Sequence, residues 1–335
     1  VNDRKCLYVN MNNFYFQGRG IADFAREFYN EGGRVLLIDQ VFKHPEWSPE
    51  LRKCYDMYPN LKIVFTGSSV MRLKEENPEL NNIVKSYNLR GFSFREFLNL
   101  KTGNHFRPYT LDEILRDHER IVKDILPKVS PLSFFQDYLH HGFYPFFQEQ
   151  RNYSENLLKT MNMVTEVDIL LIKQIELKYL TKIKKLFYLL ALEGNKAPNV
   201  SWLAQEIETS RATVMNYIKY LADARLTNMI YPKGCEFPKK PSKVMMHNTN
   251  LMYAIYPIAV KRQDVMETFF VNTMWKDHKV NQGAKDDFYW VDGSLKFKIC
   301  NANDFEKKKF RQDTIYARYN TEVGKDNLIP LWLLG

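Results

Sequence analysis

Val35-Leu-Leu-Ile-Asp39-Gln40 and Ile63-Val-Phe-Thr66-Gly67-Ser68-Ser69 are the two segments that decide the fold. In each of them a short apolar run ends in polar side chains. An apolar run of this length predicts a strand that is buried on both faces of a sheet. The helical pattern of residues 49–57 separates the two strands, and strands separated by helices indicate a parallel sheet. The sequence therefore predicts that both polar ends lie at the same edge of the sheet.

Further strands and helices follow on both sides of this pair. A strand at 7–11 and a helix at 21–29 precede it. Residues 105–180 carry helical patterns that are rich in aromatic side chains. The chain ends with a helix and with strands at 287–291 and 295–299. This order predicts an α/β first part, a helical middle and a small α+β part at the end.

The composition excludes several classes of protein. The chain has 335 residues, of which 45% are hydrophobic and 26% charged, which is typical of a globular protein. No apolar run approaches the roughly 18 residues of a membrane-spanning helix, so we expect no membrane partner. The four cysteines lie far apart and no secretory signal opens the chain, which favours a reduced, cytoplasmic protein. The net charge of +9 fits a polyanionic partner, and equally a merely soluble basic protein.

The two strand ends carry side chains that suit a nucleotide. At the carboxyl edge of a parallel sheet, the carboxylate of Asp39 can reach a Mg²⁺ ion that bridges phosphates. The next residue is Gln40, an amide that cannot act as a base at neutral pH. The hydroxyls of Thr66, Ser68 and Ser69 can hydrogen-bond a water or a phosphate oxygen. Alternatively, Ser68 or Ser69 simply caps a helix.

A phosphate-binding loop is missing from this sequence. The pattern G-x-x-x-x-G-K-S/T is absent from all 335 residues. The segment Gly18-Arg-Gly20 is too short for such a loop and lacks the lysine. Most of the affinity for phosphate would therefore have to come from elsewhere.

Residues 199–221 show a helix-turn-helix pattern, with Ser201 and Ser210 as expected caps and a shared apolar core. The second helix would present side chains that can reach bases or phosphates, namely Arg211, Thr213, Asn216 and Lys219. Two cations are few for tight binding of DNA, so a helix-turn-helix that docks onto a protein is an equally good interpretation.

Strings along the whole chain carry a family resemblance: Asp39-Gln40, Phe65-Thr-Gly-Ser-Ser69, Leu89-Arg-Gly-Phe-Ser93-Phe-Arg-Glu-Phe97, Tyr138-Leu-His-His-Gly-Phe-Tyr-Pro145, Lys243-Val-Met-Met-His-Asn-Thr-Asn-Leu-Met-Tyr253 and Ile329-Pro-Leu-Trp-Leu333. They resemble the prokaryotic AAA-type ATPases whose C-terminal part is a winged helix and a restriction-endonuclease-like domain. The resemblance implies a P-loop-type parallel sheet core at 1–104, a helical lid at 105–180, a winged helix at 181–262 and a nuclease-like α+β remnant at 263–335.

The resemblance also implies roles for residues of the first part. Asp39 matches the Walker B aspartate that contacts Mg²⁺, while Gln40 stands where the family has its catalytic glutamate. Thr66 to Ser69 match the sensor segment, and Arg90 lies where an arginine could bridge subunits of a homo-oligomer. The family's phosphate loop would precede residue 1. We expect either a longer polypeptide or a pseudo-ATPase.

For the last part, the resemblance implies a metal site that has degenerated. Glu267, Asp287 and Lys298 occupy the matching positions, and Lys298-Ile-Cys300 stands in place of a Glu-x-Lys. An ammonium in place of a carboxylate removes a metal ligand and adds repulsion, so we expect an inactive nuclease fold.

The sequence thus predicts a protein that binds ATP with Mg²⁺. In its full-length form it would be an ATPase that acts with nucleic acid or a partner protein. The alternative is a non-catalytic adaptor that binds DNA or protein through the winged helix.

Overall fold

The computed structural model describes residues 5–71, 73–149, 152–283, 288–301 and 311–335. The chain forms two compact units. The first contains the residues up to Leu89 together with Asp168–Gln174, and the second contains Arg90–Val167 and Ile175–Gly335. The predicted boundaries at 104, 180 and 262 do not coincide with this division, and the four-domain description remains a prediction.

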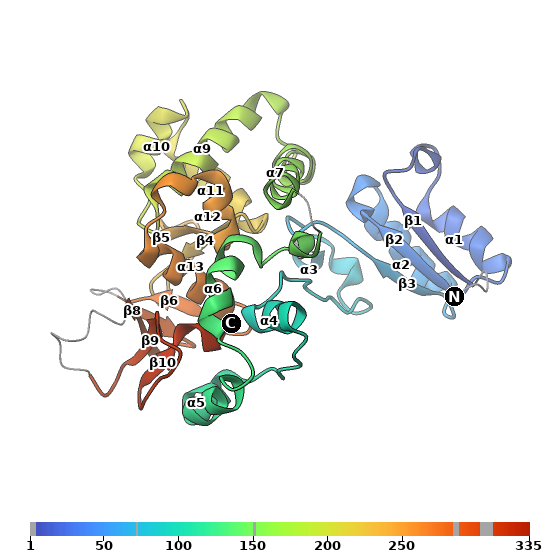
Figure 1. Ribbon diagram of the computed structural model, residues 1–335. Helices are drawn as coiled ribbons and strands as arrows, with labels where there is room; N and C mark the ends of the chain where they lie inside the picture. The colour runs from blue at the N-terminus through green and yellow to red at the C-terminus, as the bar shows by residue number, and fades with distance from the viewer. Residues whose placement is uncertain (1–4, 72, 150–151, 284–287, 302–310) are drawn as a thin grey trace. The chain divides into compact units, whose positions relative to one another are not determined.

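A three-stranded parallel sheet forms the centre of the first unit (Figure 1). The strands are β1 (Cys6–Asn10), β2 (Val35–Asp39) and β3 (Lys62–Phe65), in the order β1-β2-β3. The connections contain α1 (Ile21–Asn30) and α2 (Trp47–Met57). The prediction of a parallel α/β sheet is therefore confirmed for this unit.

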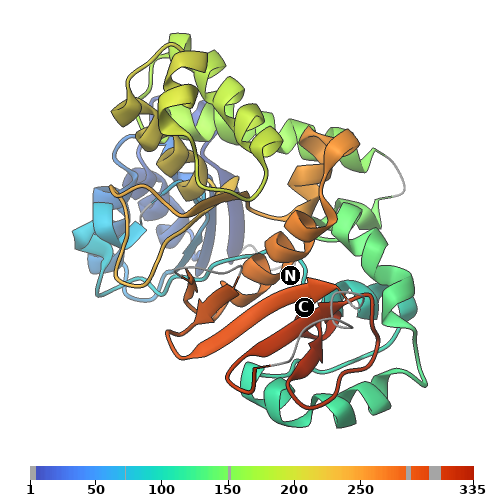
Figure 2. The same cartoon turned by 90° about the vertical axis from the view of Figure 1, so that its left-hand side faces the viewer.

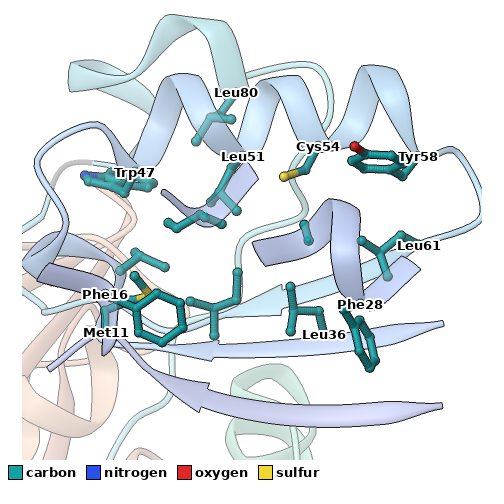
Figure 3. Packing of buried hydrophobic residues seen from close by; sticks show 14 residues of the cluster. Met11, Phe16, Phe28, Leu36, Trp47, Leu51, Cys54, Tyr58, Leu61 and Leu80 are labelled. Atoms are coloured by element: carbon teal, nitrogen blue, oxygen red, sulfur yellow. The ribbon is translucent and has the colours of Figure 1, made fainter. Parts of the chain in front are cut away.

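Only one face of this sheet is covered by helices among the described residues of the unit. Figure 3 shows the buried side chains of α1 and α2 between these helices and the strands. Leu36 and Ile38 point into this core. Alternate residues of a strand point to opposite faces, so Leu37 and Asp39 lie on the other face. Burial on both faces was the wrong prediction, because Tyr8 and Val64 on that second face are 60% and 56% exposed.

Short elements complete the first unit. They are η1 (Phe14–Gln17), η2 (Val41–Lys43), α3 (Leu73–Glu76), η3 (Pro78–Leu80) and α8 (Leu170–Ile172). Ile169, just before α8, is fully buried.

The second unit begins with helices, as the sequence predicted. They are α4 (Phe94–Thr102), α5 (Leu111–Ile125), α6 (Pro131–His141), η4 (Pro145–Gln148) and α7 (Tyr153–Met163). Thr110 and Glu113 form a capping box, which explains why α5 begins at Leu111. After Met163 the helical chain does not continue as an α-helix but changes into a π-helix at Val164–Ile169.

A helix-turn-helix lies between α9 (Leu180–Glu193) and a two-stranded hairpin. Its helices are α10 (Val200–Glu206) and α11 (Arg211–Asp223), and the hairpin strands are β4 (Thr227–Ile230) and β5 (Lys243–Met246). Ser210 caps α11 as predicted. The prediction for Ser201 is wrong, because the side chain of Asn199 accepts the N–H of Trp202 and begins α10 two residues earlier.

The C-terminal sheet has five described strands in the order β10-β9-β8-β7-β6. They are β6 (Val280–Gln282), β7 (Phe288–Val291), β8 (Leu295–Asn301), β9 (Ile315–Tyr319) and β10 (Leu328–Pro330), followed by η9 (Leu331–Leu334). β6, β7 and β8 are antiparallel neighbours, whereas β8, β9 and β10 run parallel. Ahead of them come α12 (Thr249–Ile255) and α13 (Arg262–Met274), and α13 lies against the sheet (Figure 2). Phe270 of α13 contacts Phe297 of β8, and their ring centroids are 5.2 Å apart.

Candidate functional site

A row of polar side chains lies at the carboxyl edge of the sheet in the first unit. Asp39, the last residue of β2, is in register with Asn10 at the end of β1. Thr66 follows β3 directly, and its N–H bonds the carbonyl of Ile38. Since the strands are parallel, the three side chains share the face that α1 and α2 leave uncovered. The expectation that Asp39 and Thr66 meet at one edge is confirmed.

The carboxylate of Asp39 is held by three neutral donors. Its Oδ2 accepts the hydroxyl of Tyr8 at 2.9 Å and the side-chain amide of Asn10 at 2.8 Å. Its Oδ1 accepts the hydroxyl of Thr66. No ion pair among the described residues involves Asp39. The three donors are neutral, so the carboxylate keeps its full negative charge. Its remaining lone pairs can bind an incoming cation.

Gln40 adopts a strained backbone next to this carboxylate. Its φ and ψ are 57° and 48°, the left-handed region that non-glycine residues rarely occupy. The conformation is held because the N–H of Gln40 bonds Thr66 Oγ1 at 3.0 Å. Such strain concentrates at functional sites. Gln40 nevertheless supplies an amide and no base.

The hydroxyl of Ser68 is bound by an acid from a distant part of the chain. Ser68 Oγ donates to Asp168 Oδ2 at 2.6 Å, and both residues belong to the first unit. Burial raises the pKa of the Asp168 carboxyl, while the bond from Ser68 and the charge of Lys43 act in the opposite direction. Ser69 is exposed. The loop that follows β3 is therefore held to residues 168–174 by this hydrogen bond.

We expect Asp168→Asn to stabilise the protein at neutral pH. A carboxyl whose folded pKa is raised binds its proton more tightly when folded, so its stability is greatest below the unfolded pKa and falls as pH rises through the folded pKa. Asparagine keeps an acceptor for Ser68 and removes this loss. Urea unfolding at about pH 4 and about pH 7 should show the variant gaining over the wild type only at the higher pH. An equal gain at both pH values would contradict the assignment.

The amino end of α1 is closed to a phosphate. The N–H of Ala22 donates to Glu50 Oε2 at 2.9 Å, and this carboxylate lies against Gly20. An anion at that place would meet the charge of Glu50. The structure therefore agrees with the interpretation that Gly18-Arg-Gly20 is not a phosphate loop.

Arg90 is not part of the unit that holds Asp39. It belongs to the second unit, where it is exposed. Burial, together with the positive charges of Arg225 and Arg90, lowers the pKa of His247 to about 3. Arg90 is thus grouped with Arg225 and His247 in the described structure.

The predicted nucleic-acid face of α11 offers little free charge. Lys219 forms an ion pair with Asp223 at 2.5 Å, and Thr213 Oγ1 bonds the cap Ser210. Arg211 and Asn216 are exposed. Within the described residues, Arg211 is the one predicted contact that presents a cation outside an ion pair. This makes tight binding of phosphates through α11 harder to support.

The predicted nuclease positions are not assembled around a metal. Glu267 is 4% exposed, and its Oε2 accepts Lys243 Nζ at 2.7 Å and the hydroxyl of Tyr289 at 2.6 Å. Lys298 lies between the buried Phe297 and Ile299 of β8 and therefore points away from the face that α13 covers. Asp287 lies outside the described residues. The carboxylate of Glu267, which the sequence suggested as a metal ligand, instead forms an ion pair with the ammonium of Lys243 in β5.

Sequence reasoning missed Tyr8, Asn10, Asp168 and Lys243. Asn10 carried a usable signal, because it is a polar residue near the end of the strand predicted at 7–11, just as Asp39 ends the next strand. Asp168 and Lys243 carried none, since each meets its partner through contacts distant in sequence.

In the described part of the chain no cluster of three or more His, Cys, Asp or Glu residues could hold a metal ion. No described helix has the length and apolar character to cross a membrane.

Comparison with known proteins gives two family matches. Residues 1–98 match the model of an AAA domain, and residues 133–264 match a domain of unknown function (DUF8612). The chain is 27% identical over 248 residues to an uncharacterized protein of Methanocaldococcus jannaschii. That alignment covers 70% of this chain and 52% of the relative, so the chain spans about half the length of the curated relative it matches. No solved structure matches. The first match supports an AAA-type, ATPase-like first part, a family that generally binds ATP with Mg²⁺.

Proposed function

We propose that the first unit forms part of a Mg²⁺-dependent ATP site, and that the full-length protein uses this site as an ATPase. The observation that carries the proposal is the carboxylate of Asp39, which three neutral donors orient at the carboxyl edge of a parallel sheet. The match of residues 1–98 to an AAA domain supports the same conclusion.

The residues present fit a magnesium nucleotide. Asp39 would contact Mg²⁺ directly or through a bound water, because its charge is not balanced by a described cation. Thr66 would keep its hydrogen bond to Asp39 and would lie between this carboxylate and the phosphates. Ser68 would turn its hydroxyl toward a phosphate oxygen only after leaving Asp168. The bound Mg²⁺ would neutralise charge on the phosphates, and this chain's residues would orient them.

A complete ATPase site also needs a phosphate-binding loop and a general base. β3 has no partner on its outer side among the described strands. We propose that a strand carrying a phosphate loop completes the sheet there. General-base catalysis also needs a group other than the amide of Gln40.

A second candidate function is a non-catalytic adaptor. The observation that favours it is Gln40, whose strained backbone is kept although its side chain cannot take a proton. The order of α9, α10, α11 and the β4–β5 hairpin supports a winged helix, and α13 followed by β6 to β9 supports a nuclease-like remnant. Because Asp223 neutralises Lys219, we favour a protein over DNA as the partner of this helix-turn-helix.

Binding of a fluorescent ATP analogue tests the proposal. We expect the full-length protein to bind it more tightly with Mg²⁺ than with EDTA. Asp39→Ala should weaken binding in Mg²⁺ at least tenfold, roughly the 1.4 kcal/mol of one partly exposed metal contact. It should leave binding in EDTA nearly unchanged, because the carboxylate acts through the cation.

Asp56→Ala is the matched control, since Asp56 is an exposed aspartate of the same unit that pairs with Arg52. It should bind as the wild type does. Magnesium-independent binding, or equal affinities for the Asp39→Ala variant and the wild type, would refute the ATP site. Tight binding of the analogue without hydrolysis of ATP would agree with the proposed ATP site and would support the function as a non-catalytic adaptor.

A further inference from the structure

Seven residues from the helical middle of the chain belong to the first unit. This crossing segment, Asp168–Gln174, is grouped with the first unit, while the residues on both sides of it, up to Val167 and from Ile175, are part of the second. It begins inside the π-helix at Val164–Ile169, which follows α7 directly. π-helices are rare and occur frequently at functional sites.

Polar contacts hold the crossing segment to the part of the chain that follows β3. At its start, Asp168 Oδ2 accepts the hydroxyl of Ser68 at 2.6 Å. Near its end, Lys173 Nζ lies 3.6 Å from a carboxylate oxygen of Glu76, the last residue of α3. Ile169, between these two contacts, is fully buried. The crossing segment is therefore held at the hydroxyl that the proposed ATP site would use for a phosphate.

The hydroxyl of Ser68 can donate to one acceptor at a time, because it carries a single hydrogen. In the structure this hydrogen goes to Asp168, and the N–H of Val70 bonds the hydroxyl oxygen at 3.3 Å. A hydrogen bond to an ionised carboxylate is roughly twice as strong as one to a neutral acceptor. A phosphate oxygen that accepts the same hydrogen must therefore displace a strong competitor.

From this geometry we infer that Ser68 is a latch with two positions. Its hydroxyl holds Asp168 while the ATP site is empty, and it bonds a phosphate oxygen when a nucleotide binds. Binding of a nucleotide thus releases the crossing segment, and the crossing segment in turn weakens the binding of a nucleotide by the same factor. This inference rests on the proposed ATP site and adds a means of regulating it.

A released crossing segment has a short route to the helix-turn-helix. Two residues before Asp168, the carboxylate of Glu166 forms an ion pair with Lys184 of α9. The same ammonium bonds the side chain of Asn162 in α7 at 2.9 Å. Within the second unit, α9 contacts α11, the second helix of the helix-turn-helix. We therefore expect the position of the Ser68 hydroxyl to change the stability of the π-helix, which lies between α7 and the crossing segment.

The affinity of the full-length protein for the fluorescent ATP analogue in Mg²⁺ gives the first test. Asp168→Asn should bind the analogue about fivefold more tightly than the wild type, or better, which is the lower end of typical couplings between sites. The reason is that the asparagine oxygen is a neutral acceptor, from which Ser68 is more easily released. Asp56→Asn, at an exposed aspartate of the same unit, should change the affinity by less than about twofold.

Ser68→Ala distinguishes the latch from direct repulsion between Asp168 and the phosphates. In the Ser68→Ala protein, Asp168→Asn should change the affinity by less than about twofold, because no hydroxyl is left to compete for. An equal gain with and without Ser68 would overturn the latch, as would wild-type affinity of Asp168→Asn. In both cases a loss of binding in Asp39→Ala would still support the ATP site, whereas no magnesium-dependent binding in any variant would overturn both.

Hydrogen exchange followed by mass spectrometry tests the release itself and needs no substitution. With Mg²⁺ and a non-hydrolysable ATP analogue, peptides that cover residues 164–174 of the wild type should exchange faster than without nucleotide, because a released segment opens more often. Peptides from α5 should not change. Without nucleotide, Ser68→Ala should already exchange at residues 164–174 as fast as the nucleotide-bound wild type. Unchanged or slower exchange at these residues in the nucleotide-bound wild type would contradict the latch.

Discussion

Glu267→Ala should lower the free energy of unfolding by about 3–5 kcal/mol, because it leaves a buried ammonium without its counter-charge. The side chain of Lys243 is 12% exposed, and its Nζ bonds Glu267 Oε2 at 2.7 Å and the hydroxyl of Tyr289 at 3.1 Å. Gln263 donates to the other carboxylate oxygen at 3.0 Å. Removing the carboxylate strips a partner from all three donors. Urea denaturation followed by circular dichroism measures the loss.

The control is Glu155→Ala, which breaks an exposed ion pair with Lys159 and should cost less than about 1 kcal/mol. A second comparison distinguishes the contribution of the ion pair to stability from the cost of leaving the ammonium of Lys243 unpaired. Replacing both partners, Lys243→Met together with Glu267→Leu, should recover much of the stability, since the desolvation of two ions largely offsets their attraction. A loss below about 1 kcal/mol for Glu267→Ala would show that Lys243 finds water or another partner.

This ion pair changes how the C-terminal part is understood. The sequence suggested that an ammonium at Lys298 spoils a metal site, whereas the structure brings Lys243 to Glu267 and turns Lys298 to the other side of β8. The expectation of an inactive nuclease fold remains a prediction. Its physical basis is now the Lys243 ammonium, which would have to be displaced before a cation could reach Glu267.

The elements that the sequence predicts well are those set by local pattern. The apolar runs before Asp39 and Thr66 define β2 and β3, and Thr110 with Glu113 fixes the start of α5. Parallel topology then brings Asp39 and Thr66 together without further information. The uncovered face of the sheet could not be predicted, because a continuous apolar run is read as burial on both faces whether or not helices cover both.

The partners of the site were beyond local pattern. Ser68 looked like a helix cap, and its hydroxyl instead donates to Asp168, 100 residues further along the chain. The register of β1 against β2 decides that Asn10 faces Asp39, and a shift by one residue would send it to the other face. Register and distant contacts follow from the packing of the whole unit, which no short window of sequence contains.

Asn250→Ala is expected to cost about 3–5 kcal/mol, since one buried side chain joins three helices of the second unit. Asn250, in α12, is 1% exposed. At the end of α6 its Nδ2 donates to the carbonyl of Leu139 at 2.8 Å, and its Oδ1 accepts the N–H of Phe143 at 2.9 Å. The amide thus stands between two groups that a continuing helix would bond to each other. The hydroxyl of Tyr153 in α7 completes the set.

The expected loss of stability in Asn250→Ala follows from the backbone groups that lose their hydrogen-bond partner. Alanine leaves the N–H of Phe143 and the carbonyl of Leu139 buried without their partner, and each unsatisfied group costs about 1–3 kcal/mol. Asn216→Ala, at an exposed position of α11, should change stability by no more than about 0.5 kcal/mol in the same urea assay. A loss of less than about 1 kcal/mol in Asn250→Ala would mean that α6 simply extends and closes the gap.

Asn250→Asp distinguishes hydrogen bonding from shape, because it keeps the volume and loses the two N–H donors. At neutral pH its carboxylate would face the carbonyl oxygens of Tyr138 and Leu139, so the loss should exceed that of alanine. Those oxygens and the burial would raise the pKa of the new carboxyl above its unfolded value. Stability should then be regained as pH falls through that folded pKa, because the protonated acid donates one bond again. A loss that does not change between about pH 7 and about pH 4 would show that the cavity shape, and not the amide, holds the three helices together.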